Sequence, residues 1–111
     1  MEEGEGLYDT SALIELVKRG VKRISGFTTI LNVIEYPPAA ALGLNILYPT
    51  RADYELAFIW QLELRRRGRP VPVVDLIIAA IAVNKGLKLI AVNEHFKWIT
   101  DVDSRLRLEL M

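Results

Sequence analysis

The chain has 111 residues, 51% of them hydrophobic, which is enough to form the core of one domain. Fourteen basic residues balance fourteen acidic ones, so a case for nucleic-acid binding has to rest on a local patch rather than on net charge. The chain contains no cysteine, which excludes disulfides, thiolate metal sites and cysteine catalysis and fits a cytoplasmic location. Its apolar runs are too short to cross a membrane.

The acidic, glycine-containing residues 1–6 are predicted to form a flexible tail, and residues 7–111 a single domain. A short strand at Leu7-Tyr8 leads into the N-cap cluster Asp9-Thr10-Ser11 and a helix over residues 12–19. Residues 21–26 are expected to be partly helical.

A second strand is predicted at residues 27–29, followed by a helix over residues 30–36 that places Glu35 one or two turns after the strand. Residues 39–44 are expected to add one or two helical turns, and residues 45–48 a third strand.

Thr50 and Asp53 form a capping-box pattern that opens the longest predicted helix, residues 51–67. Its large apolar side chains are expected to lie in the core or at a homodimer surface; they are Tyr54, Phe58, Trp60 and Leu62. At its end, Arg65 to Arg67 and Arg69 form a dense basic patch, interpreted either as a solvated helix terminus or as an RNA-backbone contact.

The stretch from Val74 to Val83 is apolar except for Asp75 and predicts a helix buried on most sides, bounded by Pro72 and Gly86. Asp75 then lies in the first helical turn. Two interpretations are open: a carboxylate that caps the helix, or a catalytic carboxylate held by a rigid element.

Residues 87–92 predict a strand that ends at Asn93, and residues 95–99 a packed turn. A last strand is predicted at residues 105–110, where apolar and polar residues alternate. His95, the single histidine, is interpreted as structural in preference to a general base.

Helices alternate with short strands, which predicts an α/β fold: a three-layer sandwich with a short central parallel sheet flanked by helices. Ligands bind such folds at the carboxyl ends of the strands. We therefore expect Asp9, Glu35, Asp75 and Asn93 to converge at one edge of the sheet.

Three carboxylates repel one another unless a cation lies between them. Hard oxygen ligands select Mg²⁺ or Mn²⁺, and such ions favour hydrolysis of phosphodiesters. The hydroxyls of Thr10 and Ser11 are expected to support the site from a second shell, bonding a ligand carboxylate or a phosphate.

Four segments, in order, resemble the PIN-domain family, in particular the VapC-type toxin ribonucleases of toxin–antitoxin pairs. The segments are Leu7-Tyr8-Asp9-Thr10-Ser11-Ala12-Leu13, Thr28-Thr29-Ile30-Leu31-Asn32-Val33-Ile34-Glu35, Val74-Asp75-Leu76-Ile77-Ile78-Ala79-Ala80 and Leu89-Ile90-Ala91-Val92-Asn93-Glu94-His95-Phe96. The chain departs from the family in the short segment from Pro37 to Leu44, where a helical pair is usual, and in Ala91, where Thr is frequent.

The resemblance implies a PIN-like fold and a metal-dependent endoribonuclease acting on RNA, with a small antitoxin protein as partner. It implies Asp9, Glu35 and Asp75 around Mg²⁺ or Mn²⁺, with Asn93 at a fourth position that is Asp or Asn in the family. The alternative is a catalytically weak or inactive relative that binds RNA or protein. A phospho-accepting receiver domain is disfavoured, because Asn93-Glu94-His95 stands where its lysine is needed.

Overall fold

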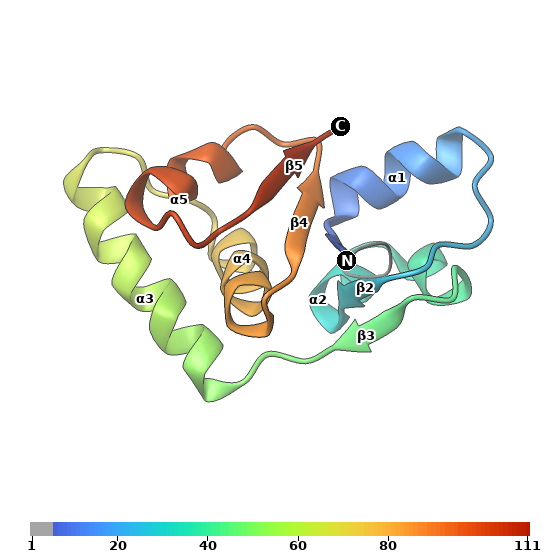
Figure 1. The fold of residues 1–111 in the computed structure, drawn as a ribbon, viewed down its shortest axis with the longest axis horizontal. Coiled ribbons are helices and arrows are strands. Elements are labelled where there is room, and N and C mark those ends of the chain that lie inside the picture. Colours follow the sequence, from blue (N-terminus) through green and yellow to red (C-terminus); the bar gives the residue numbers. More distant parts are fainter. Residues whose placement is uncertain (1–5) are drawn as a thin grey trace.

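A parallel sheet forms the middle of the molecule in a computed structural model that describes residues 6–111 (Figure 1). The described strands lie in the order β3-β2-β1-β4-β5, and every neighbouring pair is parallel. Their bounds are β1 (Gly6–Tyr8), β2 (Phe27–Thr29), β3 (Asn45–Leu47), β4 (Lys88–Ala91) and β5 (Leu108–Leu110). Because all strands run the same way, their carboxyl ends meet at one edge of the sheet.

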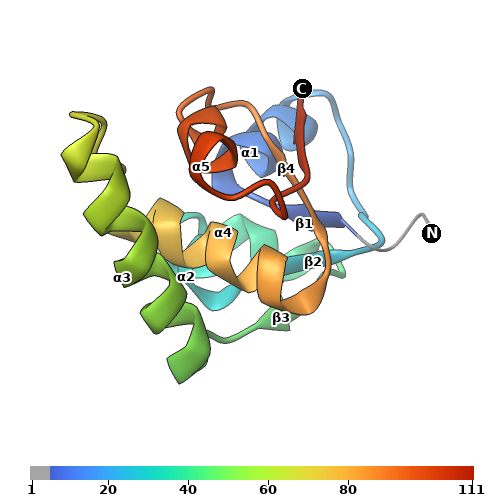
Figure 2. The ribbon, with the colours of Figure 1, turned by 60° about the vertical axis from the view of Figure 1, so that its left-hand side comes forward.

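Helices cover both faces of this sheet, as predicted (Figures 1 and 2). Their bounds are α1 (Thr10–Lys18), α2 (Ile30–Glu35), the 3-10 helix η1 (Pro37–Ala41), α3 (Arg51–Arg66), α4 (Val73–Lys85) and α5 (Phe96–Val102). Successive residues of β1 pack on opposite faces of the sheet. Leu7 belongs to the core formed with α3, α4 and α5, whereas Tyr8 packs on the smaller core around Leu13 of α1. The predicted three-layer α/β fold is confirmed.

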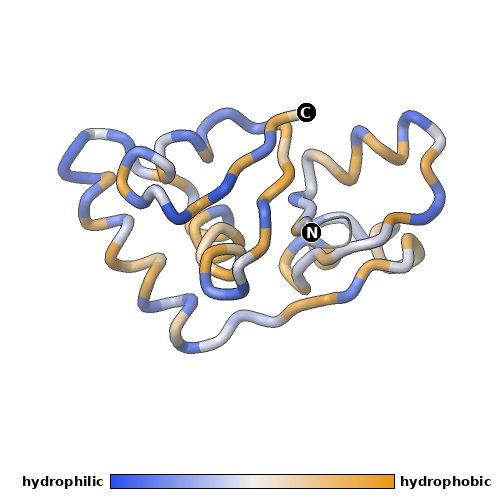
Figure 3. Tube along the Cα trace, viewed as in Figure 1, coloured by the Kyte–Doolittle hydropathy of each residue, from blue (hydrophilic) through white to orange (hydrophobic). Residues whose placement is uncertain are grey.

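Helix α4 has more buried residues than any other described helix, and the tube along its middle turns is coloured mostly as hydrophobic (Figure 3). Leu76 to Ala82 are all buried, which accounts for a run with apolar residues on every side. The helix ends where Gly86 adopts φ = 70°, a left-handed conformation that glycine enters without a steric cost. The predicted start and stop signals are therefore both confirmed.

Helix α3 carries the predicted capping box. The Asp53 carboxylate accepts hydrogen bonds from the Thr50 backbone N–H at 2.7 Å and from the Asn84 side chain on α4 at 2.7 Å. Asp53 is thereby buried with its charge satisfied. On the same helix Trp60 is buried in the core, whereas Tyr54, Phe58 and Leu62 are exposed. The large apolar side chains predicted for this helix therefore lie partly in the core and partly on the surface.

Some predictions of local structure need correction. Residues 21–25 form no helix, because Gly20 ends α1 and the chain crosses directly to β2. The segment after Glu35 is a 3-10 helix that starts at Pro37, and the last strand is limited to Leu108–Leu110. Of the predicted tail, residues 1–5 lie outside the described residues. Gly6 is not part of a tail, because it begins β1 and pairs with Lys88.

No helix in residues 6–111 is both long and apolar enough to cross a membrane.

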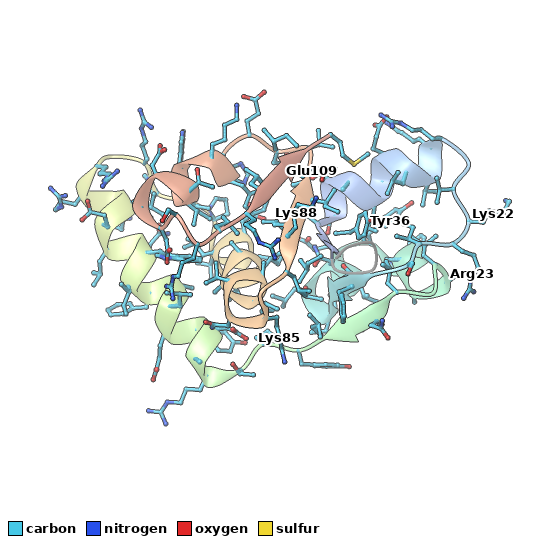
Figure 4. All side chains as sticks on the ribbon, viewed as in Figure 1. Lys22, Arg23, Tyr36, Lys85, Lys88 and Glu109 are labelled. Carbon is cyan, nitrogen blue, oxygen red and sulfur yellow. The ribbon has the colours of Figure 1, made fainter. Side chains whose placement is uncertain are left out.

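The edge strand β5 pairs with β4, and the exposed side chains of Lys88 on β4 and Glu109 on β5 form an ion pair at 2.8 Å (Figure 4). Charged side chains at such an edge oppose pairing with a further strand.

Asp103 fastens the end of α5 to α3. Its carboxylate accepts hydrogen bonds from the Arg105 guanidinium at 2.7 Å and from the Trp60 indole N–H at 3.0 Å. These contacts, led by the bond from Arg105, lower the pKa of Asp103 to about 2. Because the pKa falls on folding, the ionised carboxylate stabilises the fold above about pH 4 and loses this effect as the pH falls towards 2.

We predict that Asp103→Asn lowers the free energy of unfolding at pH 7 by about 1 kcal/mol, since Arg105 is solvent-exposed and its attraction is screened. The difference from the wild type should shrink between pH 4 and pH 2. Urea unfolding followed by tryptophan fluorescence measures it. The control Asp101→Asn, at an exposed carboxylate on the same helix, should change stability by less than about 0.5 kcal/mol; equal losses in both variants would contradict this role of Asp103.

Candidate active site at the carboxyl edge of the sheet

Asp9 lies directly after the central strand β1 and is 98% buried, with a relative exposure of 2%. It is the N-cap of α1: its Oδ2 accepts hydrogen bonds from the Ser11 backbone N–H at 3.3 Å and from the Ser11 hydroxyl at 2.8 Å. The same hydroxyl accepts the Val92 backbone N–H at 3.0 Å, beyond the end of β4. Ser11 therefore ties the carboxylate to two neighbouring strand ends.

Glu35 reaches the same edge from the last turn of α2. It is exposed, and its Oε1 accepts a hydrogen bond from the Thr10 hydroxyl at 2.8 Å. Thr10 and Ser11 thus each bind one of the predicted carboxylates, as expected for second-shell groups.

Asn32 is a site residue that sequence reasoning missed. It is fully buried on α2, and its amide nitrogen donates to Asp9 Oδ1 at 3.3 Å and to the Thr10 hydroxyl at 2.9 Å. Its amide oxygen accepts from the backbone N–H and the hydroxyl of Thr29 at 3.2 and 2.7 Å. One side chain therefore holds Asp9, Thr10 and the N-cap of α2 in a fixed relation.

Asp75 is the third residue of α4 and lies at the helix end that faces this edge. Its Oδ2 is 2.6 Å from Nε2 of His95, so its carboxylate pairs with an imidazole rather than capping the helix through backbone N–H groups. Burial raises the pKa of Asp75 above its ordinary value, and the negative charges of Asp9 and Glu35 raise it further, while the bond from His95 opposes the shift. The three acids therefore act on one another electrostatically.

An open cleft of about 570 Å³ joins these side chains. All of the predicted site and second-shell residues line it, together with Ile14; they are Asp9, Thr10, Ser11, Glu35, Asp75 and Asn93. Asn93 is exposed at the end of β4. The next residue, Glu94, lies near Lys97 at 3.8 Å and does not line the cleft.

The cleft offers oxygen donors of the type that Mg²⁺ and Mn²⁺ prefer. Within residues 6–111, however, no group of three or more histidine, cysteine, aspartate or glutamate side chains has the arrangement needed to hold a metal ion. Magnesium usually binds one or two carboxylates and completes its shell with water and phosphate oxygens. The donor set thus fits such an ion by its chemistry and charge, with water and substrate as further ligands.

The two missed contacts had weak signals in the sequence. Asn32 stands three residues after Thr29, the spacing of a capping box, but in a position where Glu or Gln is usual. His95 was interpreted as structural because it precedes the packing residue Phe96, and its contact with Asp75 joins positions 20 residues apart. Only the folded chain brings α4 and the segment after β4 together.

Neither a family model nor a curated protein matches the sequence. Solved structures do match. A chain of VapBC-1 from nontypeable Haemophilus influenzae has 22% identity and a TM-score of 0.74, and the match covers 95% of this chain and 96% of that one. A chain of VapBC-5 from Mycobacterium tuberculosis, a member of the VapBC family of toxin–antitoxin systems, has 21% identity and a TM-score of 0.75, with 96% and 98% covered.

A chain of VapBC2 from Rickettsia felis, whose structure contains a DNA fragment from its promoter, has 16% identity and a TM-score of 0.75, with 96% and 98% covered. At these identities the likeness defines the fold. The chain has the PIN-like α/β fold found in structures of VapBC toxin–antitoxin systems, and the fold expected from the four sequence segments is confirmed.

We predict that Asn32→Ala lowers the free energy of unfolding by about 2 kcal/mol, because buried Asp9 and Thr29 lose the hydrogen bonds that they make with Asn32. Urea unfolding in EDTA measures this. The control Asn45→Ala removes an exposed amide that binds the Gly26 carbonyl, and it should cost about 0.5 kcal/mol. If the two variants were equally stable, Asn32 would not be the organising contact described here.

Proposed function

We propose that this protein is a metal-dependent endoribonuclease that hydrolyses RNA phosphodiester bonds with Mg²⁺ or Mn²⁺. The observation that carries the proposal is the convergence of three carboxylates and one amide on a single cleft, at the carboxyl edge of the sheet, in a fold shared with VapBC structures. Burial raises the pKa of Asp75 most and the charges of Asp9 and Glu35 add to the rise; a bound cation would offset both effects.

Asp9, Glu35, Asp75 and Asn93 are the proposed metal-binding and catalytic residues. When bound, the ion supplies charge neutralisation at the phosphodiester and activates a water molecule. Asp9 and Asp75 provide buried or half-buried carboxylates on rigid elements, and Glu35 and Asn93 provide exposed oxygens in the same cleft.

Four further side chains hold this set in place. Ser11 and Asn32 bind Asp9, Thr10 binds Glu35, and His95 binds Asp75. Because each bond restricts one carboxylate, the groups that contact the substrate start from defined positions.

The proposed biological role is that of the toxin in a toxin–antitoxin pair in the cytoplasm, with a small antitoxin protein as partner. The fold shared with VapBC structures supports this role. The second candidate is an inactive PIN-like module that binds RNA or protein. Two observations favour this alternative: Asn93 is neutral, and no three acids within residues 6–111 are arranged around one point.

We predict metal-dependent cleavage of a fluorescent single-stranded RNA in Mn²⁺ or Mg²⁺ and none in EDTA. Asp75→Asn should lower the rate by about 100-fold or more, because it removes a negative charge from the proposed ion site. The protein should also unfold at a higher temperature with Mn²⁺, and this shift should shrink in Asp75→Asn.

The matched control is Glu55→Gln, which removes an exposed carboxylate that pairs with Arg51, far from the cleft. It should keep both the cleavage rate and the Mn²⁺ shift within about two-fold of the wild type. A folded wild-type protein with neither cleavage nor a Mn²⁺ shift would support the inactive binding module instead.

We also propose a homodimer through the exposed apolar side chains of Tyr54, Phe58 and Leu62 on α3 with Val73 at the start of α4. Three of them line a shallow apolar hollow of about 220 Å³; they are Tyr54, Phe58 and Val73. Exposed apolar patches of this kind are typical of protein interfaces.

Light scattering at micromolar concentration should give twice the chain mass of 12.6 kDa. Phe58→Glu should shift the protein to monomer, because it places a charge in the apolar contact. Ile34→Glu, at a similarly exposed side chain on α2, should leave the dimer intact. A monomeric wild type would refute the dimer.

A further inference from the structure

The end of α3 and helix α5 enclose a second hollow, separate from the cleft. Its volume is about 300 Å³, and it is lined by Leu64, Arg67, Arg69, Trp98 and Asp101. Figure 2 shows the last turns of α3 beside α5 at the upper left of the molecule. Two guanidinium groups and an indole ring in one hollow are a combination suited to a phosphate-bearing ligand.

The backbone that carries Arg69 is held firmly. Gly68 leaves the helix with φ = 74°, and the Arg69 N–H binds the Leu64 carbonyl at 2.8 Å. The Gln61 side chain then donates to the Val71 carbonyl at 2.7 Å and accepts the Val71 N–H at 3.2 Å. The turn after α3 therefore presents Arg69 in a fixed direction.

The guanidinium of Arg69 is also positioned by its neighbours. It lies 5.6 Å from the centre of the Trp98 ring, within the range of a cation–π contact, and 3.8 Å from Asp101. The distance to Asp101 is long for a hydrogen bond, so the carboxylate attracts Arg69 without occupying its N–H groups. These donors remain available to an anionic oxygen.

The charges around the hollow are unbalanced in favour of cations. Arg67 and Arg69 line it together with the carboxylate of Asp101, and the neighbouring sequence adds Arg65 and Arg66 against Glu63. Arg66 and Arg67 both bind Glu63 and lower its pKa to about 2, so one negative charge serves two cations. In a chain of zero net charge, this is a local patch of about two positive charges.

Two segments of the chain carry residues of both the hollow and the contact between Asp75 and His95. Arg69 precedes Asp75 by six residues, and Trp98 follows His95 by three, on the first turn of α5. The 2.6 Å contact between Asp75 and His95 joins these two segments at the cleft. The two segments that meet at Asp75 and His95 therefore also carry Arg69 and Trp98 of the hollow.

We propose that this hollow is a second subsite that binds a backbone phosphate of a single-stranded RNA lying across the cleft. Arg67 and Arg69 hold the phosphate, and Trp98 orients Arg69. The subsite rests on the proposed function for its substrate class. It gives a chain of zero net charge a local cationic surface that attracts an acidic polymer.

The test is binding of a fluorescein-labelled 12-nucleotide RNA, followed by anisotropy in EDTA over a range of KCl concentrations. Arg67→Gln/Arg69→Gln should weaken binding by about five-fold and lower the slope of log Kd against log[KCl] by about 0.7, the value for one lost phosphate contact. Circular dichroism checks that the variant is folded.

The matched control is Lys22→Gln/Arg51→Gln, which removes the same charge elsewhere. Lys22 follows α1 at the opposite end of the molecule (Figure 4), and Arg51 begins α3 with its side chain 92% exposed. This variant should bind the RNA within two-fold of the wild type. Equal weakening in both double variants, or no weakening in either, would overturn the subsite.

The variant Asp101→Asn gives a second measurement that does not depend on the stability of the arginine variant. It removes the negative charge that lines the hollow and would repel a phosphate, so it should tighten RNA binding by about three-fold; unchanged or weaker binding would overturn the subsite. The outcomes are separable from the nuclease test. Specific binding without cleavage in Mn²⁺ would refute the proposed nuclease and retain the subsite, whereas cleavage with unchanged binding in the arginine variant would refute the subsite alone.

Discussion

The buried carboxylate of Asp9 is the constraint on which the arrangement of the cleft depends. An ionised group with 2% exposure is tolerated only where hydrogen bonds replace its water, and here Ser11 and Asn32 supply them. Ser11 also binds the backbone beyond β4, and Asn32 also binds Thr10 and Thr29. The need to satisfy one charge therefore aligns α1, α2 and two strand ends.

Around this charge the fold accepts an electrostatic conflict. Asp75 and Glu35 share the cleft with Asp9. Burial raises the pKa of Asp75, the charges of Asp9 and Glu35 raise it further, and the bond from His95 opposes the rise. Repulsion of this kind opposes folding, and such local conflicts concentrate at functional sites. In the proposed function, a bound cation would relieve this repulsion by neutralising the acids.

The apolar core makes this conflict tolerable. Leu76 to Ala82 anchor α4 between the sheet and α3, so the polar end of the helix is positioned by packing rather than by its own contacts. The same packing sets the end of α3 beside α5, where Arg69 lies over Trp98. One buried helix therefore positions the carboxylate of Asp75 and supports the packing of α3, whose end carries the cationic surface.

Much of the fold was predictable from the sequence: the order of helices and strands, the burial of α4 and the Thr50–Asp53 cap. So was the meeting of four side chains at one edge of the sheet, those of Asp9, Glu35, Asp75 and Asn93. Hydrophobic periodicity, capping residues and the geometry of parallel strands are local or topological rules that a single chain displays. These rules failed for residues 21–25, which were predicted to be partly helical. The residues there are compatible with a helix, but the segment only connects α1 to β2. The partners of the carboxylates depended on tertiary structure: Asn32 with Asp9, His95 with Asp75, and Arg69 with Trp98 each join residues more than 19 positions apart. Side-chain contacts at such separations are decided by how helices pack on the sheet, and sequence spacing alone does not encode that packing.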